Sequence, residues 1–252
     1  MLVLGIDLET TGVDKIHDRI VEVGAVLWDT DLKVPVEIYS ELVKEEDRPV
    51  IDSSFDVSHI TPEMIDNYGQ DPEDIISSID DMVCKSDYIV AHNGLNFDQE
   101  MLQNFYKRYD HELSNEIWLD TRYHIDYPEM CKSRSLIYLM GYHGFVNPFP
   151  HRALFDVMTT LKILSNYDIH RVIEIAESPT IYLVAIVSFN RKDEAKQAGY
   201  MWEPDVRFDF DQKQKGFWIK ERKLAMFDES ELEESFEVRV EEEYQGKLRS
   251  DL

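Results

Sequence analysis

The chain contains 252 residues, of which 43% are hydrophobic and 12% aromatic, and its formal net charge is −25. This length holds one full α/β domain with a small appendage, and the apolar content excludes a disordered protein. Nucleic-acid enzymes usually present a basic surface, so the net charge by itself argues against a nucleic-acid substrate.

Short apolar runs that end in polar turns predict strands in the first part of the chain. We expect an antiparallel meander of strands over residues 2–6, 20–28 and 36–43. Helices are expected over 62–68 and 72–84, because each begins with a proline, which favours the first helical turn.

Strands and helices alternate in the middle of the chain. A strand over 88–91 precedes a helix over 97–109, a brief strand covers 117–119, and a further helix lies within 148–167. Strands followed by alternating strands and helices predict a mixed sheet with helices on its faces, which is the α/β class.

A domain boundary is expected near residues 176–180, at the end of a large domain that spans 1–176. Beyond it, a strand, a short helix and a second strand predict a compact βαβ-like α+β module over 180–227. An acidic tail is expected over 228–252, either solvated or forming an exposed helix, because residues 228–243 hold 9 acidic residues and 1 basic residue.

The sequence contains no signal for export or membrane insertion. An acidic residue at position 7 comes too early for a signal peptide, and the apolar run Ile181 to Val187 is far shorter than a membrane span. Cys84 and Cys131 lack the spacing of a zinc site or a disulfide framework, and they fit a reducing cytosol. We therefore expect a cytoplasmic protein without a membrane partner.

Asp7 and Glu9 lie two residues apart at the end of the first strand, so their side chains leave the same face. Two adjacent carboxylates repel each other unless a cation lies between them, which makes this pair a candidate metal site. For the pair alone, an acidic strand end exposed to solvent is an alternative of equal weight.

Three further residues are candidates, and each has a structural alternative. Asp98 stands near the start of a helix, where an acidic side chain can act as a helix cap. Asp156 falls among apolar helix positions, where an acid is costly unless it is paired or bound to a metal. His151 precedes it at the exposed start of the same helix, where a lone histidine is more often structural than catalytic.

Together these residues form motifs that resemble the DEDDh (DnaQ-like) family of 3′→5′ exonucleases. The three main motifs read IDLETTG over residues 6–12, HNGLNFD over 92–98 and HRALFD over 151–156. Two secondary signatures, SHITP at 58–62 and LDT at 119–121, occur in the family's order. The resemblance covers the large domain and implies a ribonuclease-H-like fold.

The resemblance implies that Asp7, Glu9, Asp98 and Asp156 hold two divalent metal ions, Mg²⁺ or Mn²⁺. Two such ions activate a water molecule and stabilise the leaving 3′ oxygen. His151 would be the general base, since histidine accepts protons near neutral pH, and the product would be a nucleoside 5′-monophosphate. The five-residue step from His151 to Asp156 separates this branch from the branch that uses a tyrosine.

The family also implies a pocket for the terminal nucleotide, where aromatic stacking accepts any base. The residues that match this pocket are Thr10, Thr11, Gly12, His59, Asn93 and Phe97. In one departure from the family pattern, His59 is followed directly by Ile60, where many members have glycine. This change could alter the base pocket without affecting the metal site.

Three functions are compatible with these residues. Degradation of single-stranded or 3′-ended DNA, alone or with a replication or repair partner, is favoured by a likeness to exonuclease X and proofreading relatives. An RNA-trimming enzyme of the same family is the first alternative, and a catalytically silent nucleic-acid-binding protein is the second. The C-terminal module could also bind nucleic acid through basic residues and an aromatic ring, namely Lys192, Lys196, Lys213, Lys215, Lys220 and Arg222 with Trp218. The equally weighted alternative is that its tryptophans belong to the core and its lysines only increase solubility.

Overall fold

The chain divides into two compact units, Met1–Ala176 (unit 1) and Glu177–Leu252 (unit 2), which are described separately. The computed structural model describes the following residues: 1–45, 58–114, 117–211, 214 and 216–245. Within these ranges no helix is both long and apolar enough to cross a lipid bilayer.

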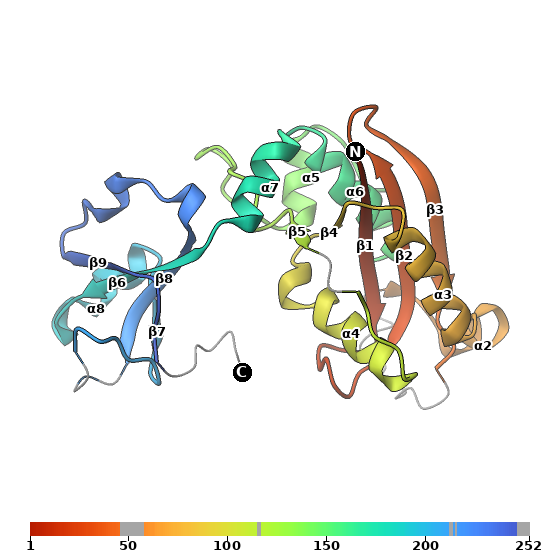
Figure 1. Ribbon diagram of the computed structural model, residues 1–252, viewed down its shortest axis with the longest axis horizontal. Helices are drawn as coiled ribbons and strands as arrows, with labels where there is room; N and C mark the ends of the chain where they lie inside the picture. Colours follow the sequence, from red (N-terminus) through yellow and green to blue (C-terminus); the bar gives the residue numbers. More distant parts are fainter. Residues whose placement is uncertain (46–57, 115–116, 212–213, 215, 246–252) are drawn as a thin grey trace. The chain divides into compact units, whose positions relative to one another are not determined.

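Unit 1 is built on one mixed sheet with helices on both faces (Figure 1). Its strands are β1 (Leu2–Thr10), β2 (Ile20–Asp29), β3 (Val34–Leu42), β4 (Tyr88–Ala91) and β5 (Trp118–Asp120). The spatial order is β3-β2-β1-β4-β5, in which β1, β2 and β3 pair antiparallel, while β4 and β5 run parallel to β1. The expected ribonuclease-H-like mixed sheet is therefore confirmed.

The helices of unit 1 follow the strands closely in sequence. They are α2 (Pro62–Tyr68), α3 (Pro72–Val83), the 3-10 turn η1 (Gly94–Asn96), α4 (Asp98–Arg108), α5 (Leu136–Tyr142), α6 (Ala153–Leu164) and α7 (Ile169–Glu177). The prolines at the starts of α2 and α3 stand where a missing backbone N–H has no cost, and Thr61 and Asp71 cap the two helices.

Alternation of side chains along the strands separates two apolar clusters, one on each face of the sheet. Leu4 and Ile6 of β1 belong to the cluster that α3 and α4 cover. Val3 of the same strand belongs to the cluster that contains Val157 and Leu161 of α6. The odd-numbered positions of β1 therefore face α6, and Asp7 and Glu9 share that face.

Unit 2 contains an antiparallel sheet of order β7-β8-β6-β9. Its elements are β6 (Thr180–Ile186), η2 (Phe189–Arg191), α8 (Lys192–Gln197), β7 (Met201–Glu203), β8 (Phe217–Lys223), η3 (Leu224–Met226), η4 (Glu229–Leu232) and β9 (Glu237–Glu241). The expected βαβ-like arrangement is wrong, because β6 and β8 pair antiparallel, whereas a βαβ unit requires parallel strands.

The segment expected to be an acidic tail or exposed helix instead contributes β9 to this sheet. Its charged residues, Glu237, Arg239 and Glu241, alternate with valines, and Val238 packs against the cluster that contains the buried Phe236. Net charge concealed this two-residue period, which is the pattern of a half-exposed strand. Residues 246–252 of the expected tail lie outside the described ranges.

Candidate active site

Two glycines let helix α6 approach the sheet beside the carboxylates of β1. A Cβ atom on Gly5 would lie 2.6 Å from the Cγ2 atom of Val157, and one on Gly24 would lie 2.4 Å from the backbone carbonyl carbon of Ala153. Because neither position has room for a side chain, the backbone of α6 lies directly over β2, and side chains of α6 lie directly over β1. Asp156, in the first turn of α6, is thereby brought to the face that carries Asp7 and Glu9.

An ion pair between the partly exposed Arg152 and the buried Glu22 fixes the start of α6. Glu22 of β2 lies opposite Glu9 in the strand register and is only 2% exposed. The Nη2 atom of Arg152 lies 2.6 Å from Glu22 Oε1, and the backbone N–H of Ala153 donates to Glu22 Oε2 at 2.9 Å. The hydrogen bonds that the Arg152 guanidinium donates to Glu22 raise its pKa, and the contact joins β2 to the helix start.

Both carboxylate oxygens of Asp156 accept a hydrogen bond. The amide of Asn147 donates to Oδ1 at 2.5 Å, and the backbone N–H of His151 donates to Oδ2 at 3.0 Å. His151 has a left-handed backbone with φ of 61°, a conformation uncommon for a residue with a Cβ atom. Its exposed ring remains beside Glu9 and Asp156, and potential ligand atoms of the three side chains lie within 4.8 Å of one another.

Asp98 is the first residue of α4 and is buried. Its Oδ1 atom accepts a hydrogen bond of 3.1 Å from the backbone N–H of Leu8, the residue between Asp7 and Glu9. The helix start is thus joined to the strand that carries the other acids. The alternative of a simple helix cap does not account for this contact across the fold.

Burial raises the pKa values of all four acids. The pKa of Asp7 is well above its usual range, first because of burial and then because of the charges on Asp98 and Asp156. Burial, followed by the charge on Asp156, raises the pKa of Glu9 to about 8, and burial raises that of Asp98 to about 7. The pKa of Asp156 is also raised, again chiefly by burial.

Such a cluster suits a hard divalent cation. Carboxylate oxygens are the preferred ligands of Mg²⁺ and Mn²⁺, and bound cations offset the repulsion that otherwise favours protonation. The residues present therefore fit the metal ions that the motifs imply. Asp7 and Glu9 are half-buried, so the alternative of a strand end exposed to solvent is wrong.

Asp120, in the LDT signature, holds the loop before Asp98 in place. Its Oδ1 atom accepts from the backbone N–H of Asn93 at 2.9 Å, and its Oδ2 atom accepts from that of Leu95 at 3.1 Å. These bonds stabilise the left-handed backbone of Asn93, whose φ is 69°. The amide oxygen of Asn93 in turn accepts from the hydroxyl of Tyr123 at 2.9 Å.

The residues expected to hold the terminal nucleotide belong to two loops and one helix start. Thr11 is buried, and its hydroxyl donates to Asp18 Oδ1 at 2.8 Å, while the hydroxyl of Thr10 donates to the carbonyl of Gly12 at 2.6 Å. His59 is exposed just before α2, and Phe97, before α4, packs against the apolar core. Thr11 therefore orders its own loop, and the contacts of this set with a nucleotide stay predictions.

The sequence analysis assigned no role to three residues that shape the site. Glu22 could have been singled out as an acid within the apolar run IVEVGAV, a position that demands a partner. Arg152 stands inside the HRALFD motif, but its partner is 130 residues away. Asn147 lies in an irregular loop, where no periodicity reveals what its side chain contacts.

The basic set predicted in unit 2 is partly neutralised. Lys220 and Arg222 both contact Glu231, at 3.0 and 2.8 Å, and the rings of Trp202 and Trp218 lie 5.8 Å apart. Lys213 and Lys215 lie outside the described residues.

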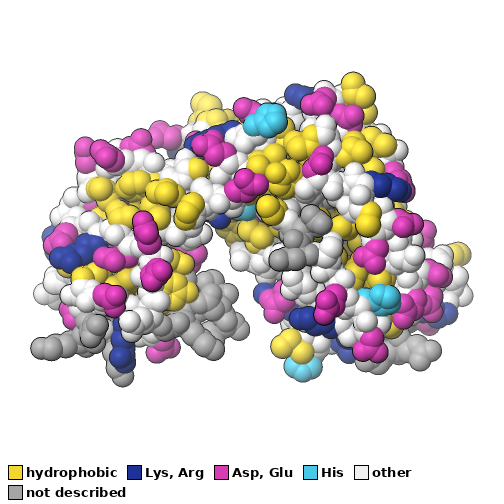
Figure 2. Space-filling model, viewed as in Figure 1, with side chains coloured by type: hydrophobic (Ala, Val, Ile, Leu, Met, Phe, Trp, Pro, Cys, Tyr) yellow, Lys and Arg dark blue, Asp and Glu magenta, His cyan; other side chains and the backbone are white. Residues whose placement is uncertain are grey.

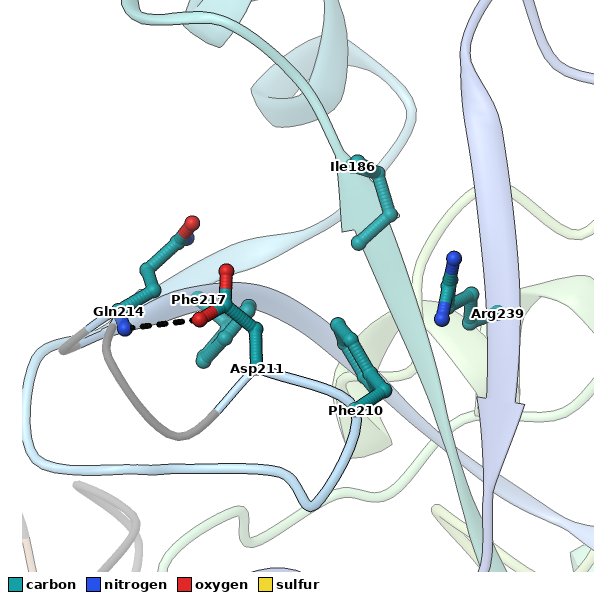
Figure 3. A pocket seen from close by; sticks show the side chains of 6 residues that line it. All are labelled: Ile186, Phe210, Asp211, Gln214, Phe217 and Arg239. Carbon is teal, nitrogen blue, oxygen red and sulfur yellow. Dashed lines mark hydrogen bonds between the residues drawn. The ribbon is translucent and has the colours of Figure 1, made fainter.

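Unit 2 also has a cavity of about 180 Å³, shown in Figure 3. It is lined by Ile186, Phe210, Asp211, Gln214, Phe217 and Arg239, and its single carboxylate does not make it a metal site.

Comparison with known protein families shows which family the chain belongs to. The family model described as exonuclease (RNase T) matches residues 4–164, which is more than half of the chain. The chain belongs to this exonuclease family. Its HRALFD motif, with His151 five residues before Asp156, places it in the DEDDh branch.

Curated relatives of this DEDDh exonuclease chain are bacterial replication proteins. The PolC-type DNA polymerase III of Mycoplasma genitalium is 29% identical over 145 residues, which cover 56% of this chain and 9% of the polymerase. The DNA polymerase III subunit epsilon of Treponema pallidum is 38% identical over 96 residues, which cover 38% of this chain and 42% of the subunit. The chain thus corresponds to less than half the length of either relative.

Solved DEDDh structures share the fold. E. coli exonuclease I in complex with a dT13 oligonucleotide has a TM-score of 0.58 at 18% identity, covering 73% of this chain and 48% of that one. The nuclease domain of 3′hExo, a DEDDh family member bound to rAMP, has a TM-score of 0.54 at 17% identity, covering 66% of this chain and 90% of that one. At such identities the likeness concerns the fold alone.

Proposed function

We propose that this chain is a 3′→5′ exonuclease that hydrolyses DNA from its 3′ end and releases nucleoside 5′-monophosphates. The observation that carries the proposal is the convergence of Asp7, Glu9, Asp98 and Asp156 beside His151, in a chain that belongs to the exonuclease family. Two buried and two half-buried acids at one place would destabilise the fold without a cation to offset their charge.

The four acids would hold two divalent metal ions, Mg²⁺ or Mn²⁺. Such ions supply an activated water and a counter-charge for the leaving 3′ oxygen. His151 would take the proton of the attacking water, since its ring is exposed at the edge of the acid cluster. The hydrogen bond from its backbone N–H to Asp156 would hold the general base His151 at a fixed position beside that metal ligand. Thr10, Thr11, Gly12, His59, Asn93 and Phe97 would position the terminal nucleotide.

DNA is the proposed substrate because the curated relatives are parts of DNA polymerases. The same relatives support a replication or repair partner and a cytoplasmic location. RNA trimming is the alternative, and the related fold of 3′hExo bound to rAMP favours it. Because RNA differs from DNA at the 2′ position of each sugar, contacts at that position would distinguish the two.

A time course on 5′-labelled DNA and RNA oligonucleotides of one sequence tests the proposal, with Mg²⁺, Mn²⁺ or EDTA. We expect a metal-dependent ladder that shortens from the 3′ end, faster on DNA, and largely lost in Asp7→Ala and His151→Ala. His170→Ala, an exposed histidine of α7, is the matched control and should keep full activity. Faster loss of RNA would move the function to RNA trimming. No shortening of either strand would leave a catalytically silent binding protein.

A further inference from the structure

The surface beside the active site differs in charge from the rest of the chain. The sequence has 51 acidic residues, yet residues 130–155 contain none, and Asp156 is the single acid between Glu129 and Asp168. The acid-free run contains Lys132, Arg134 and Arg152. Arg152 is paired with Glu22, but Lys132 and Arg134 remain in a run without acids, so in a chain of net charge −25 this segment repels a polyanion less than an average segment does.

The same segment exposes aromatic rings on α5. Tyr138 and Tyr142 lie one turn apart, and their exposed rings stack with centroids 6.4 Å apart and an interplanar angle of 17°. Ile137 beside them is 65% exposed. Figure 2 shows hydrophobic side chains at the surface over the area where Figure 1 places α5 and α7. Exposed apolar groups gathered in this way mark a binding surface.

Hydrogen bonds made by Asn147 connect α5 to Asp156. The backbone N–H of Asn147 donates to the Sδ atom of Met140 in α5, which packs the loop against the helix. The side chain of Asn147 contacts Asp156 and accepts a bond of 2.9 Å from the backbone N–H of Phe149. Phe149 is 56% exposed, and its ring packs against that of Phe155 in α6, with centroids 4.8 Å apart.

We propose that the exposed face of α5 and the loop that carries Phe149 hold the single strand upstream of the scissile phosphate. The bases would stack on Tyr138 and Tyr142, and the phosphates would lie near the exposed Lys132. Stacking on aromatic rings accepts any base, as a processive or non-specific nuclease requires. This inference rests on the proposed function, because the nuclease site defines which end of the strand enters.

The test measures binding and cleavage separately in the full chain. Tyr138 and Tyr142 are both replaced by leucine, which keeps the apolar surface and the helix but removes the rings. Binding of a labelled 12-nucleotide DNA is followed by fluorescence anisotropy in EDTA, and cleavage of a dinucleotide is followed with Mg²⁺. Tyr68→Leu, an exposed tyrosine at the end of α2, is the matched control.

We expect the double variant to bind the 12-nucleotide strand about tenfold more weakly or worse, with the control unchanged. Its rate on the dinucleotide should stay within about twofold of the wild type, because a dinucleotide does not reach α5. Lys132→Gln should lower the slope of log affinity against log salt by about 0.7, and Lys107→Gln on α4 should not. Unchanged binding of the long strand would overturn the inference.

Two further outcomes separate this inference from the proposed function. If the wild type fails to cleave the dinucleotide but the double variant still loses affinity for the long strand, the strand-binding face holds and the nuclease function fails. If oligonucleotide binding is unchanged while sedimentation shows that the variant no longer self-associates, the face binds a second copy of the chain, and the inference is wrong.

Discussion

Asp156 illustrates how one residue depends on its hydrogen-bond donors. Asn147 donates to one of its oxygens and the backbone of His151 to the other, so the carboxylate has little freedom to rotate. We expect Asn147→Ala to weaken Mn²⁺ binding about 10–100-fold, as losing a partner of a metal ligand usually does. Calorimetric titration with Mn²⁺ measures this, and Asn166→Ala, at the end of α6, serves as control. Equal Mn²⁺ affinity in both variants would show that Asp156 needs no such donor.

Glu9 makes the stability of the metal-free protein depend on pH. Its pKa is raised from 4.5 to about 8, chiefly by burial, so the folded state disfavours its ionised form. The contribution of Glu9 to stability should therefore be greatest at low pH and should fall as pH rises from about 4.5 to about 8. In EDTA, we expect a lower melting temperature at pH 8.5 than at pH 6, and a smaller difference in Glu9→Gln.

Addition of Mg²⁺ gives the complementary result. Because the cation binds the ionised acids, it should raise the melting temperature more at pH 8.5 than at pH 6. General self-repulsion of the acidic chain also changes with pH, but it is shared by the wild type and Glu9→Gln. Identical pH slopes in the two proteins would therefore contradict the assignment of Glu9 to the buried cluster.

The sequence reveals the acids of the site more readily than their supports. Asp7 and Glu9 are found from a two-residue period at a strand end, and Asp156 from an acid among apolar helix positions. The contact of Arg152 with Glu22 joins residues far apart in the chain, and local patterns contain no record of it. Their spatial arrangement depends on how closely α6 approaches the sheet.

At the scale of whole elements, Gly5 and Gly24 set the distance between α6 and the sheet. We expect Gly24→Ala to cost about 1–3 kcal/mol, because its Cβ would lie 2.4 Å from the backbone of Ala153 and push α6 away from β2. Activity should fall further, about a hundredfold, since Asp156 moves with the helix. Thermal unfolding and cleavage rates measure the two effects.

Gly141 in α5 provides the matched control for this prediction. A Cβ atom there would meet no atom within 4 Å, so Gly141→Ala should stabilise the protein by about 0.5–1 kcal/mol through helix propensity. Its cleavage rate should match that of the wild type. If Gly24→Ala lost stability without a larger loss of activity, α6 would not position Asp156.

The elements of unit 1 were largely predictable, and those of unit 2 were less so. Long apolar runs and prolines at helix starts indicate β1, β2, α2 and α3 because packing and local preference agree there. β9 is not predicted because charged residues in an acidic segment carry its alternation, and its partner β6 lies more than fifty residues earlier. Pairing between distant strands follows from packing, which composition does not describe.

At the scale of the whole molecule, each unit has apolar clusters of its own. The clusters around Phe105 and Val157 contain residues of unit 1, and those around Leu183 and Phe217 contain residues of unit 2. A unit with a separate core can fold by itself. We therefore expect residues 1–176 to fold when expressed alone and to cleave a dinucleotide at a rate within about threefold of the full chain, because all five proposed catalytic residues belong to this unit.

Calorimetry and cleavage assays measure this prediction together. The full chain should show two heat-absorption peaks, of which the fragment retains one. The Asp7→Ala form of the fragment is the control for contaminating nucleases.

A folded fragment that binds the 12-nucleotide strand as the full chain does would confine strand binding to unit 1. A folded fragment with lower affinity for that strand would assign the difference to unit 2, whose basic residues Lys220 and Arg222 are partly neutralised by Glu231. An unfolded fragment would contradict the prediction, because the core of unit 1 would then require unit 2.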